Sequence, residues 1–583
     1  MQFSSNSSNI NSTSYGPMWC LFRRNLSSEI LHPSSKWVYN ILFNHLRDSH
    51  SKSSEVPIVV KEHFQNSMFC LLVLIMRFGE TQIKEIGNVQ SMEGALHSTL
   101  EIFLSKSDAL RATPIQSNME VWFIIVIALC ISALLKSLLF NKVSENQNKL
   151  PPGPSHIQIL RYFLLRRKPL ELELTLTLRK LHAMYGPIIT IYIGFVPDII
   201  IANHSLAHKA LMQNSVVFAD RPATLPTDLI LSSNRHSINT SSYGPMATLS
   251  SQSHFKDSPP FTHEILLSRT QIKKIEEGCQ RLILSSGRFA ILNSFPSIGR
   301  ILFRKRWEEL FQLRRNQDDV LIPFIKARRK VRQERHSKMK EVKENEDEFV
   351  VSYADTLLDL ELPEEKRKLS EEEMVSLCSE FLVAGTDTTS TALEWIMANM
   401  VKYPQIQERL LVEMKGVVGD GEKEVKVEDS NKMPYLKAVV LEGLRRHPPA
   451  HLVIPHAVTE DVVLDGYLVP KNGTLHFNVV EMGRDPKVWE DPMAFKPERF
   501  LNGEGEAFDI TGSREIKMMP FGAGRRICPA SSLAILHLEY FVANLVWNFD
   551  WKAVEGDEVD LSEQQEFTVV MKNPLKAQIS PRL

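Results

Sequence analysis

The residues whose types and spacing best suit chemistry surround Cys528, in the segment Phe521-Gly522-Ala523-Gly524-Arg525-Arg526-Ile527-Cys528-Pro529. Its two glycines allow the backbone to approach a flat ligand, while Arg525, Arg526 and the start of the following helix favour a thiolate over a thiol. A thiolate is a ligand for a soft metal. An isolated cysteine is more often a small buried apolar residue, but these neighbours favour a metal ligand. Because position 527 is not a third glycine, the segment does not fit a dinucleotide-binding loop.

A second group of polar residues lies inside a long predicted helix. A capping box begins at Ser370 and a proline follows Tyr403, so the pattern predicts a helix over 370–403. Asp387 and Thr388 place an acid and a hydroxyl in mid-helix, where both residue types are poor helix formers. This placement indicates that the two polar groups have a functional role. The alternative is that the Thr388 hydroxyl only hydrogen-bonds the preceding turn of the helix.

A third pair of residues, Glu442 and Arg445, lies three positions apart on a helix predicted over 433–446. At this spacing the two side chains share one helix face and can form an ion pair. Such pairs are usually solvated surface pairs that contribute about 0.5 kcal/mol. The pair alone therefore favours a solvated surface role over a structural one.

The elements that must position these residues are mostly helices. Shorter β-branched and aromatic runs predict a hairpin within 180–201, broken at Gly194 and Pro197, and strands over 462–469 and 474–480. The fold class is therefore mainly α, an α+β arrangement with a small β-rich region.

The composition limits the function classes open to the chain. It has 583 residues, of which 43% are hydrophobic and 23% charged, and a net charge of −1 at pH 7. These values are typical of a globular protein with a sizeable core, and they provide no basic field that would attract nucleic acid. The six cysteines form no C-x-x-C pair. This argues against a zinc ribbon, a c-type haem attachment and a disulfide framework, and it fits a reducing, cytosolic environment.

Taken together, the segments from about residue 119 onward resemble the cytochrome P-450 superfamily of haem-thiolate monooxygenases. The cysteine segment resembles the haem-binding loop of that family, and three further family motifs occur in the family's order: Ala384-Gly385-Thr386-Asp387-Thr388-Thr389, Glu442-x-x-Arg445 and Pro497-Glu498-Arg499-Phe500. Residues 433–436 and 495–500 are similar to plant A-type members, in particular to the 89A subfamily. The resemblance implies a cytochrome P-450-like haem domain.

The resemblance also implies roles for individual residues. Cys528 would be the axial thiolate ligand of haem b, and the implied cofactor-binding residues are Cys528, Arg526, His456, Phe521 and Gly524. Thr388 would hydrogen-bond dioxygen at the haem, and Asp387 would help to deliver protons there. Arg499 would complete a buried structural triad with Glu442 and Arg445.

The implied activity is the insertion of one oxygen atom from O2 into an apolar small molecule. A partner NADPH-cytochrome P-450 reductase would supply the electrons, and thiolate donation to iron favours cleavage of the O–O bond. The other implied partners are the substrate and membrane lipid, without nucleic acid. Peroxide rearrangement without a reductase is an alternative that Asp387 and Thr388 argue against.

An apolar run, residues 119–140, is predicted to be a single transmembrane anchor. Fifteen residues from Val121 carry no charge, and with the apolar residues that follow the run reaches about 20 residues, enough to cross the hydrocarbon. A buried core helix is the weaker interpretation because the run is apolar on all sides. Lysines follow the run, so the positive-inside rule places the haem domain in the cytosol, at the endoplasmic reticulum membrane, and residues 1–118 on the lumenal side. Residues 141–154 form a proline-rich hinge.

The chain contains a partial internal copy. Residues 10–18 recur with small changes at 238–246, an offset of 228, whereas residues 81–84 recur at 270–273, an offset of 189. The downstream copy is therefore 39 residues shorter than the upstream copy. Two copies with unequal gaps do not make a solenoid.

We interpret residues 1–118 as a partial duplicate of a haem-domain segment. An error in assembling the gene model would produce the same repeated sequence. The haem-thiolate monooxygenase domain is then 155–583, lacking about 39 residues between Pro245 and Thr270. The missing part includes a W-x-x-x-R helix of the family, whose likeness, Trp19 to Arg23, occurs in the upstream copy.

A second departure from the family pattern is Ala530, which stands two residues after the cysteine in place of the usual glycine. Its methyl group is small, but it lies near the expected haem edge. The missing residues and this alanine support an alternative function, a catalytically inactive membrane-bound product of a disrupted or fused gene.

Overall fold

The computed structural model describes residues 42, 46, 58–76, 150–155, 174–193, 196–223, 225–233, 237, 239–241, 292, 303–341, 353–362, 366–419, 421–501 and 508–582. Two compact units divide the chain. The first unit comprises Met1–Thr81 together with Pro151–Leu583, and the second comprises Gln82–Leu150. The predicted anchor lies outside the described residues. Among those residues, we find no helix that combines the length and the apolar character needed to cross a bilayer.

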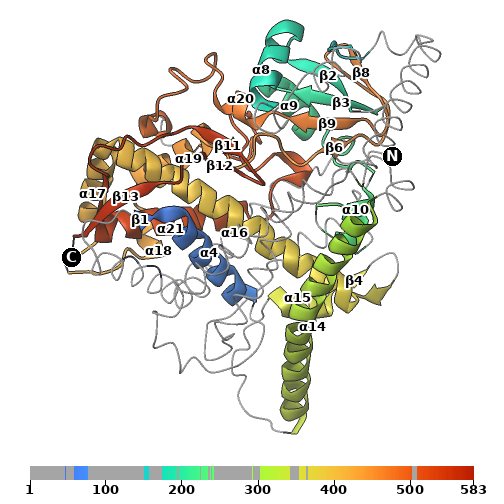
Figure 1. Ribbon diagram of the computed structural model, residues 1–583, viewed down its shortest axis with the longest axis horizontal. Helices are drawn as coiled ribbons and strands as arrows, with labels where there is room; N and C mark the ends of the chain where they lie inside the picture. Colours follow the sequence, from blue (N-terminus) through green and yellow to red (C-terminus); the bar gives the residue numbers. More distant parts are fainter. Residues whose placement is uncertain are drawn as a thin grey trace, which may run out of the picture. The chain divides into compact units, whose positions relative to one another are not determined.

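The central element of the first unit is α16 (Glu371–Lys402), the long helix across the middle of Figure 1. Its capping box forms as predicted, because the Ser370 hydroxyl accepts a hydrogen bond from the Glu373 amide, and the Glu373 carboxylate accepts one from the Ser370 amide. The helix ends at Tyr403, where Pro404 begins the next helix. The prediction of one helix over 370–403 is therefore confirmed.

Other helices pack around α16 and bury its apolar side chains. They are α14 (Arg304–Glu341), α17 (Pro404–Val417), α19 (Pro434–Arg446) and α21 (Ser531–Asn548). Trp395 of α16, Leu436 of α19 and Phe541 of α21 lie in one hydrophobic cluster and are each about fully buried. On the opposite part of α16, the Arg314 side chain of α14 donates hydrogen bonds to Ser376 Oγ at 2.8 Å and to the Glu372 carbonyl at 2.7 Å.

A four-stranded sheet with the order β2-β3-β9-β6 lies at one end of the unit (Figure 1). It contains β2 (Ile188–Ile193), β3 (Val196–Ile201), β9 (Thr474–Phe477) and β6 (His456–Ala457), and α8 (Leu174–Tyr185) packs beside it. Strands β2 and β3 form the predicted antiparallel hairpin, whereas β3 runs parallel to β9. Pro197 lies within β3 opposite Tyr192 instead of breaking it.

The later strand predictions are confirmed with one correction. The segments β7 (Val462–Leu464) and β8 (Tyr467–Val469) pair across the predicted turn. The strand predicted over 474–480 is too long, because the Asn478 side chain accepts a hydrogen bond from the Glu481 amide and starts α20 (Val479–Gly483).

Part of the segment before the predicted anchor belongs to this same unit. Strand β1 (Ile58–Val59) pairs antiparallel with β13 (Lys576–Pro581), which also pairs with β10 (Phe549–Ala553). Helix α4 (Val60–Met76) follows β1 and lies along α16, as Figure 1 shows in blue against gold.

The core contacts of α4 are extensive. Phe64 and Met68 are each 1% exposed within the cluster that contains α16 and α21, and Phe69 lies in a second cluster with residues 374–382 of α16. Gly385 allows the close approach, since a Cβ there would meet the Leu72 side chain at 2.7 Å. For residues 58–76, this packing differs from the expectation that residues 1–118 lie apart from the haem domain on the lumenal side.

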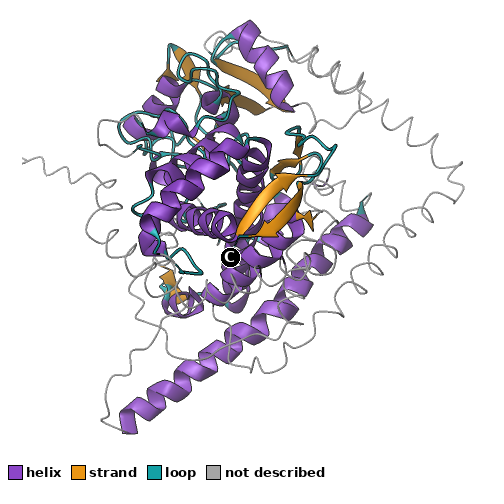
Figure 2. Ribbon diagram, turned by 90° about the vertical axis from the view of Figure 1, so that its left-hand side faces the viewer, coloured by secondary structure: helices purple, strands orange, loops and turns teal. Residues whose placement is uncertain are grey.

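The remaining described elements are short, and Figure 2 shows how helices dominate the unit. They are α9 (His204–His208), the π-helix η5 (Lys209–Gln213), α10 (Pro226–Leu231), α15 (Tyr353–Asp359), β4 (Glu361–Leu362), β5 (Arg367–Lys368), α18 (Val427–Ser430), the 3₁₀ helices η6 (Pro497–Phe500) and η7 (Gly524–Arg526), β11 (Glu563–Gln565) and β12 (Val569–Met571).

Candidate active site: a cysteine loop and an acid turn

The cysteine loop, residues 521–529, is shaped by short-range backbone hydrogen bonds. The Cys528 amide donates to the Phe521 carbonyl at 2.9 Å, and the Gly522 amide donates to the Met519 carbonyl at 3.0 Å. Gly522 and Gly524 have φ angles of +71° and +70°. L-residues with a side chain rarely adopt these angles, so both glycines serve the loop conformation directly.

Gly524 also allows the loop to lie close against another segment of the backbone. A Cβ at this position would lie 2.1 Å from the carbonyl oxygen of Leu211 in η5, whereas the nearest atoms to a Cβ at Gly522 are 3.9 Å away. The sequence suggested that the glycines leave room for a flat ligand. At Gly524 the structure shows that the room is taken by the backbone of η5.

The Cys528 residue is partly exposed, but its thiol is not predisposed to ionise. Burial raises the pKa of the Cys528 thiol to about 11, although the Ala530 amide partly offsets this. The expectation that Arg525 and Arg526 favour the thiolate is thus wrong for the protein alone. The reason is burial of the thiol, and the two arginine side chains have partners elsewhere: the Arg525 side chain donates to Ser215 Oγ, and the Arg526 side chain donates to the carbonyls of Ala219 and Ser241. A thiolate here requires a bound metal, which deprotonates a coordinating thiol outright.

Ala530, the residue in place of the usual glycine, has an ordinary backbone conformation. It precedes α21 with φ −99° and ψ 16°, angles that residues with a side chain adopt freely. Its side chain packs against the main hydrophobic cluster. The alanine therefore imposes no backbone strain on the loop.

Three basic side chains gather beside the loop: Arg221, Arg526 and His456. Burial and the neighbouring charge of Arg526 lower the pKa of Arg221 to about 10. The Arg221 guanidinium donates to the carbonyls of Ile454 and Pro455, yet its buried Nε has no hydrogen-bond partner. A partly buried pair of guanidinium groups, Arg221 and Arg526, with an orphaned donor is suited to an anionic group. The residues therefore fit a haem, whose two propionates would add negative charge to that of the neighbouring Asp220 and Glu380.

His456 is held by Nδ1, which donates to the Phe218 carbonyl at 2.8 Å. Burial, followed by the charge of Arg221, lowers its pKa to about 3. A neutral His456 therefore presents only an acceptor at Nε2. To pair with a propionate as the resemblance implies, it must also be protonated at Nε2, which a nearby carboxylate favours.

A second candidate region is the acid turn, residues 384–388 of α16. In this turn Ala384 is exposed and residues 385–388 are partly buried, whereas 389–401 are all buried. The Thr388 hydroxyl donates to the Ala384 carbonyl at 2.6 Å, the bond to the preceding turn that the sequence left open as the alternative. The Asp387 carboxylate accepts hydrogen bonds from Gln65 at 2.9 Å and from Thr568 at 2.6 Å.

The structure brings the predicted triad together in the interior. The Arg445 guanidinium forms two hydrogen bonds with the Glu442 carboxylate, at 2.6 and 2.7 Å, and Arg499 Nε lies 3.3 Å from Glu442 Oε1. The side chains of Glu442 and Arg445 are both 0% exposed. Arg445 also donates to the Gly483 and Pro492 carbonyls. The group is therefore buried and fully hydrogen-bonded, unlike a solvated surface pair.

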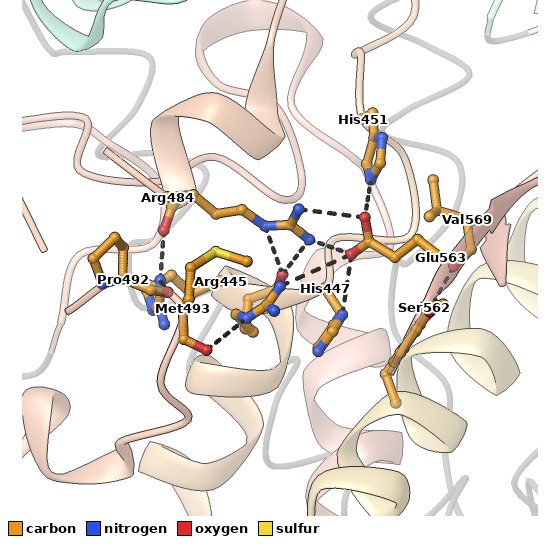
Figure 3. A network of polar contacts seen from close by, with 12 residues as sticks. Arg445, His447, His451, Arg484, Pro492, Met493, Ser562, Glu563 and Val569 are labelled. Atoms are coloured by element: carbon orange, nitrogen blue, oxygen red, sulfur yellow. Dashed lines mark hydrogen bonds and ion pairs between the residues drawn. The ribbon is translucent and has the colours of Figure 1, made fainter. Parts of the chain in front are cut away.

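A second polar network lies at the end of α19 and centres on Glu563 of β11 (Figure 3). His447 Nδ1 lies 3.2 Å and His451 Nε2 3.4 Å from the carboxylate, which also pairs with Arg484. Burial opposes ionisation of Glu563, but the hydrogen bonds from His447 and His451 and the charge of Arg484 hold its pKa well below the usual range. Burial lowers the pKa of His447 to about 3. The network therefore joins a carboxylate to a neutral histidine.

Sequence reasoning missed several of these residues because their partners are remote in the chain. Arg221, Glu563, Gln65 and Thr568 belong to no motif, and no spacing links any of them to its partner. Trp19 and Arg23, the likeness of the missing family helix, lie outside the described residues.

Comparisons with known proteins show the family of the chain. A sequence model of the Cytochrome P450 family matches residues 151–247 and 261–581. The chain is 45% identical to Cytochrome P450 89A9 of Arabidopsis thaliana over 79% of this chain and 98% of that protein. It is 28% identical to a flavonoid 3'-monooxygenase of the same plant, over 79% of this chain and 97% of that protein. A solved zebra fish cytochrome P450 structure with progesterone, 22% identical, covers 70% of this chain and 99% of that chain with a TM-score of 0.55.

Proposed function

The chain belongs to the cytochrome P450 family of monooxygenases, and from that premise we propose that it inserts one oxygen atom of O2 into an apolar small molecule. Electrons come from NADPH through a partner cytochrome P450 reductase. Haem with cysteine thiolate ligation is the cofactor that the family implies, and Cys528 is the proposed axial ligand.

The observation that carries this proposal is the cysteine loop beside a partly buried cationic pair, Arg221 and Arg526. Cys528 is a partly exposed residue in a glycine loop, and Arg221 has a buried Nε without a hydrogen-bond partner next to Arg526. Among the described cysteines, Cys378 is fully buried in an apolar cluster, and burial raises its pKa well above the usual range. Cys528 is therefore the better metal ligand of the two.

Bound haem would supply oxygen activation, and this chain's residues supply position and protons. Cys528 would hold the iron, and Arg221, Arg526 and a protonated His456 would pair with the propionates. On α16, Thr388 carries a hydroxyl that can leave the Ala384 carbonyl to donate elsewhere, and Asp387 is the nearest acid in sequence for proton delivery.

The inactive alternative lacks its main support. It rested on residues missing from the downstream copy and on Ala530. However, α4 of the upstream copy packs in the core of the same unit, and Ala530 fits its backbone without strain. Both observations favour a folded, haem-binding domain over the inactive product.

Membrane attachment is part of the proposal. We propose that residues 119–140 attach the chain to the endoplasmic reticulum membrane with the haem domain on the cytosolic face, which the apolar run and the lysines after it support. A single crossing of the bilayer would separate α4 from α16. The packing of α4 therefore favours an arrangement in which both flanks of residues 119–140 stay on the cytosolic face, over single-pass insertion.

Glycosylation distinguishes these two arrangements. Asn6, Asn11 and Asn25 each begin an N-x-S/T acceptor sequence. When the full chain is made in the presence of microsomes, we expect no glycan at these asparagines. Endoglycosidase-sensitive glycans would support single-pass insertion instead.

The experiment that tests the activity is a CO-difference spectrum of the reduced full chain in membranes, followed by reductase-dependent NADPH oxidation. We expect the spectrum of thiolate-ligated haem and NADPH oxidation that depends on both the reductase and O2. Absence of bound haem in a well-folded chain would contradict the proposal.

A further inference from the structure

We infer that Gln65 of α4 is a positioning residue for Asp387, and that Gln65 and Thr568 together hold the carboxylate of the acid turn by both of its oxygens. The role in proton delivery rests on the proposed function. The contact itself does not, so the two can be tested separately.

The carboxylate of Asp387 is held from two directions outside its own helix. Gln65 Nε2 donates to Oδ1 at 2.9 Å, and Thr568 Oγ1 donates to Oδ2 at 2.6 Å. Gln65 lies in α4, and Thr568 directly precedes β12. An ionised carboxylate only accepts hydrogen bonds, and these two donors give each oxygen a partner.

A third residue fixes the direction of the hydrogen bond from Thr568. Thr391, one turn after Asp387 on α16, has its hydroxyl oxygen 3.0 Å from that of Thr568. Because a hydroxyl has one proton and Thr568 gives its proton to Asp387, the Thr391 hydroxyl must donate to Thr568. Thr391 and Thr568 are each 2% exposed. The result is a directed, buried chain from Thr391 through Thr568 to Asp387.

The Gln65 side chain is fixed because α4 is fixed. On one side of Gln65, Phe64 lies in the main core, and β1 before the helix pairs with β13. On the other side, Leu72 packs against Gly385, two residues from Asp387. The amide of Gln65 therefore approaches the acid turn from a helix that is held by packing contacts both before and after Gln65.

The consequence concerns orientation. Asp387 and Thr388 are adjacent in sequence, so their side chains leave α16 about 100° apart, and the Thr388 hydroxyl is bonded to Ala384. A proton relay between them depends on where the Asp387 carboxylate is held. Small displacements of a positioned catalytic group have large effects on rate. Loosening either donor should therefore impair proton delivery, so that more of the consumed O2 leaves as hydrogen peroxide and less is divided between the oxygenated product and water.

The contact is tested by a double-mutant cycle on the unfolding of the full chain. Gln65→Met keeps the length of the side chain and removes the donor, and Asp387→Ala removes the acceptor with its charge. We expect a coupling of roughly tenfold in the unfolding equilibrium constant, typical of a hydrogen bond to a charged group. The matched control is Lys61→Met, one turn earlier on α4, whose side chain pairs with Glu566 and should not couple to Asp387. Additive effects of Gln65→Met and Asp387→Ala would overturn the contact.

The positioning role is tested in the haem-loaded full chain with reductase, NADPH and O2. We expect Gln65→Met to raise the fraction of O2 released as hydrogen peroxide about twofold or more and to shift its pH profile, while the CO-difference spectrum stays unchanged. Thr568→Val, which loosens the other oxygen, should act in the same direction and provides the test if Gln65→Met does not fold. Lys61→Met should leave the fraction and its pH profile as in the parent.

The outcomes separate the inference from the proposed function. If the parent chain binds no haem, the proposed function fails, while the unfolding cycle still decides the contact. If the cycle shows coupling but neither Gln65→Met nor Thr568→Val changes the peroxide fraction or its pH profile, the contact is only structural and the positioning role is wrong.

Discussion

The cysteine loop and the acid turn are built in opposite ways. The backbone of the cysteine loop is closed by hydrogen bonds between residues within ten positions of one another, such as the Cys528 amide to the Phe521 carbonyl. The acid turn takes both partners of its carboxylate from remote parts of the chain, Gln65 and Thr568. A loop with local bonds carries its own geometry, whereas the acid turn receives its geometry from the whole fold.

This difference decides how each region tolerates change. The cysteine loop should fail through single substitutions inside its own nine residues. The acid turn should respond to substitutions hundreds of positions away while its own helix stays intact. The changes that follow test this contrast.

Removing the Cys528 thiol should have the largest effect. Cys528→Ser replaces the proposed axial ligand, so we expect complete loss of the thiolate signature in the CO-difference spectrum. Cys378→Ser is the matched control, because Cys378 is buried in an apolar cluster away from the loop, and it should keep the signature. Loss of the signature in Cys378→Ser with retention in Cys528→Ser would reverse the assignment.

The two loop glycines provide a matched pair with a smaller expected effect. Gly522→Ala adds a side chain at φ +71° whose nearest neighbours are at an ordinary contact distance of 3.9 Å, whereas Gly524→Ala adds one at φ +70° that would meet the Leu211 carbonyl at 2.1 Å. Chemical denaturation should show a loss of about 1 to 2 kcal/mol for Gly522→Ala and of about 3 kcal/mol or more for Gly524→Ala. Equal losses would mean that the close approach to η5 does not matter.

On the acid turn, Thr388→Ala should change chemistry and leave the fold intact. Alanine is the better helix former, so the free energy of unfolding should not fall. The hydroxyl is lost, and we expect turnover to divert several-fold more O2 to hydrogen peroxide at unchanged haem content, which corresponds to about 1 kcal/mol in the branching of the reaction. The measurement is peroxide released per NADPH oxidised. An unchanged ratio would remove Thr388 from proton delivery.

Low pH should lower the folding stability of the region around the cysteine loop, because this region contains buried neutral histidines. Burial lowers the pKa of His537 on α21 to about 3, from an ordinary value near 6.5. The unfolded chain therefore takes up the proton first, and stability is lost as the pH falls below 6.5, by at most about 1.4 kcal/mol per pH unit for one such histidine.

His537→Leu tests this smallest effect. The substitution removes the titrating group and a buried Nε2 without a hydrogen-bond partner, so stability at pH 7 should hold. Denaturation curves between pH 7 and 5 should show a shallower loss in the variant than in the parent. Parallel curves would mean that His537 is not neutral in the fold.

The same contrast explains what could be predicted from the sequence. The helix over 370–403 and the motif residues were predictable, because capping boxes, prolines and glycine loops act over a few positions. The burial of Glu442 with Arg445 was implied by the resemblance, since spacing alone favours a surface pair. The family and its mainly α fold could likewise be predicted from short motifs.

Long-range partners could not be predicted. The sequence pattern of residues 58–76 is that of an ordinary apolar helix and does not specify its packing partner. Its position against α16 depends on Gly385 and on the pairing of β1 with β13. We expected the neighbouring arginines to lower the pKa of the Cys528 thiol, but burial raises it. The side chains of Arg525 and Arg526 are oriented by hydrogen bonds to another segment of the chain, which the sequence does not show.

The docking of α4 has a consequence for the order of events during synthesis. Gln65 leaves the ribosome about 500 residues before Thr568, and at 5 to 20 residues per second the interval is about 25 to 100 s. During this time the apolar residues Phe69 and Leu72 have been made while their α16 partners have not. Holdase chaperones or the translocon can bind such a helix before its partner exists, so the yield of complete acid turns depends on how long nascent α4 stays free.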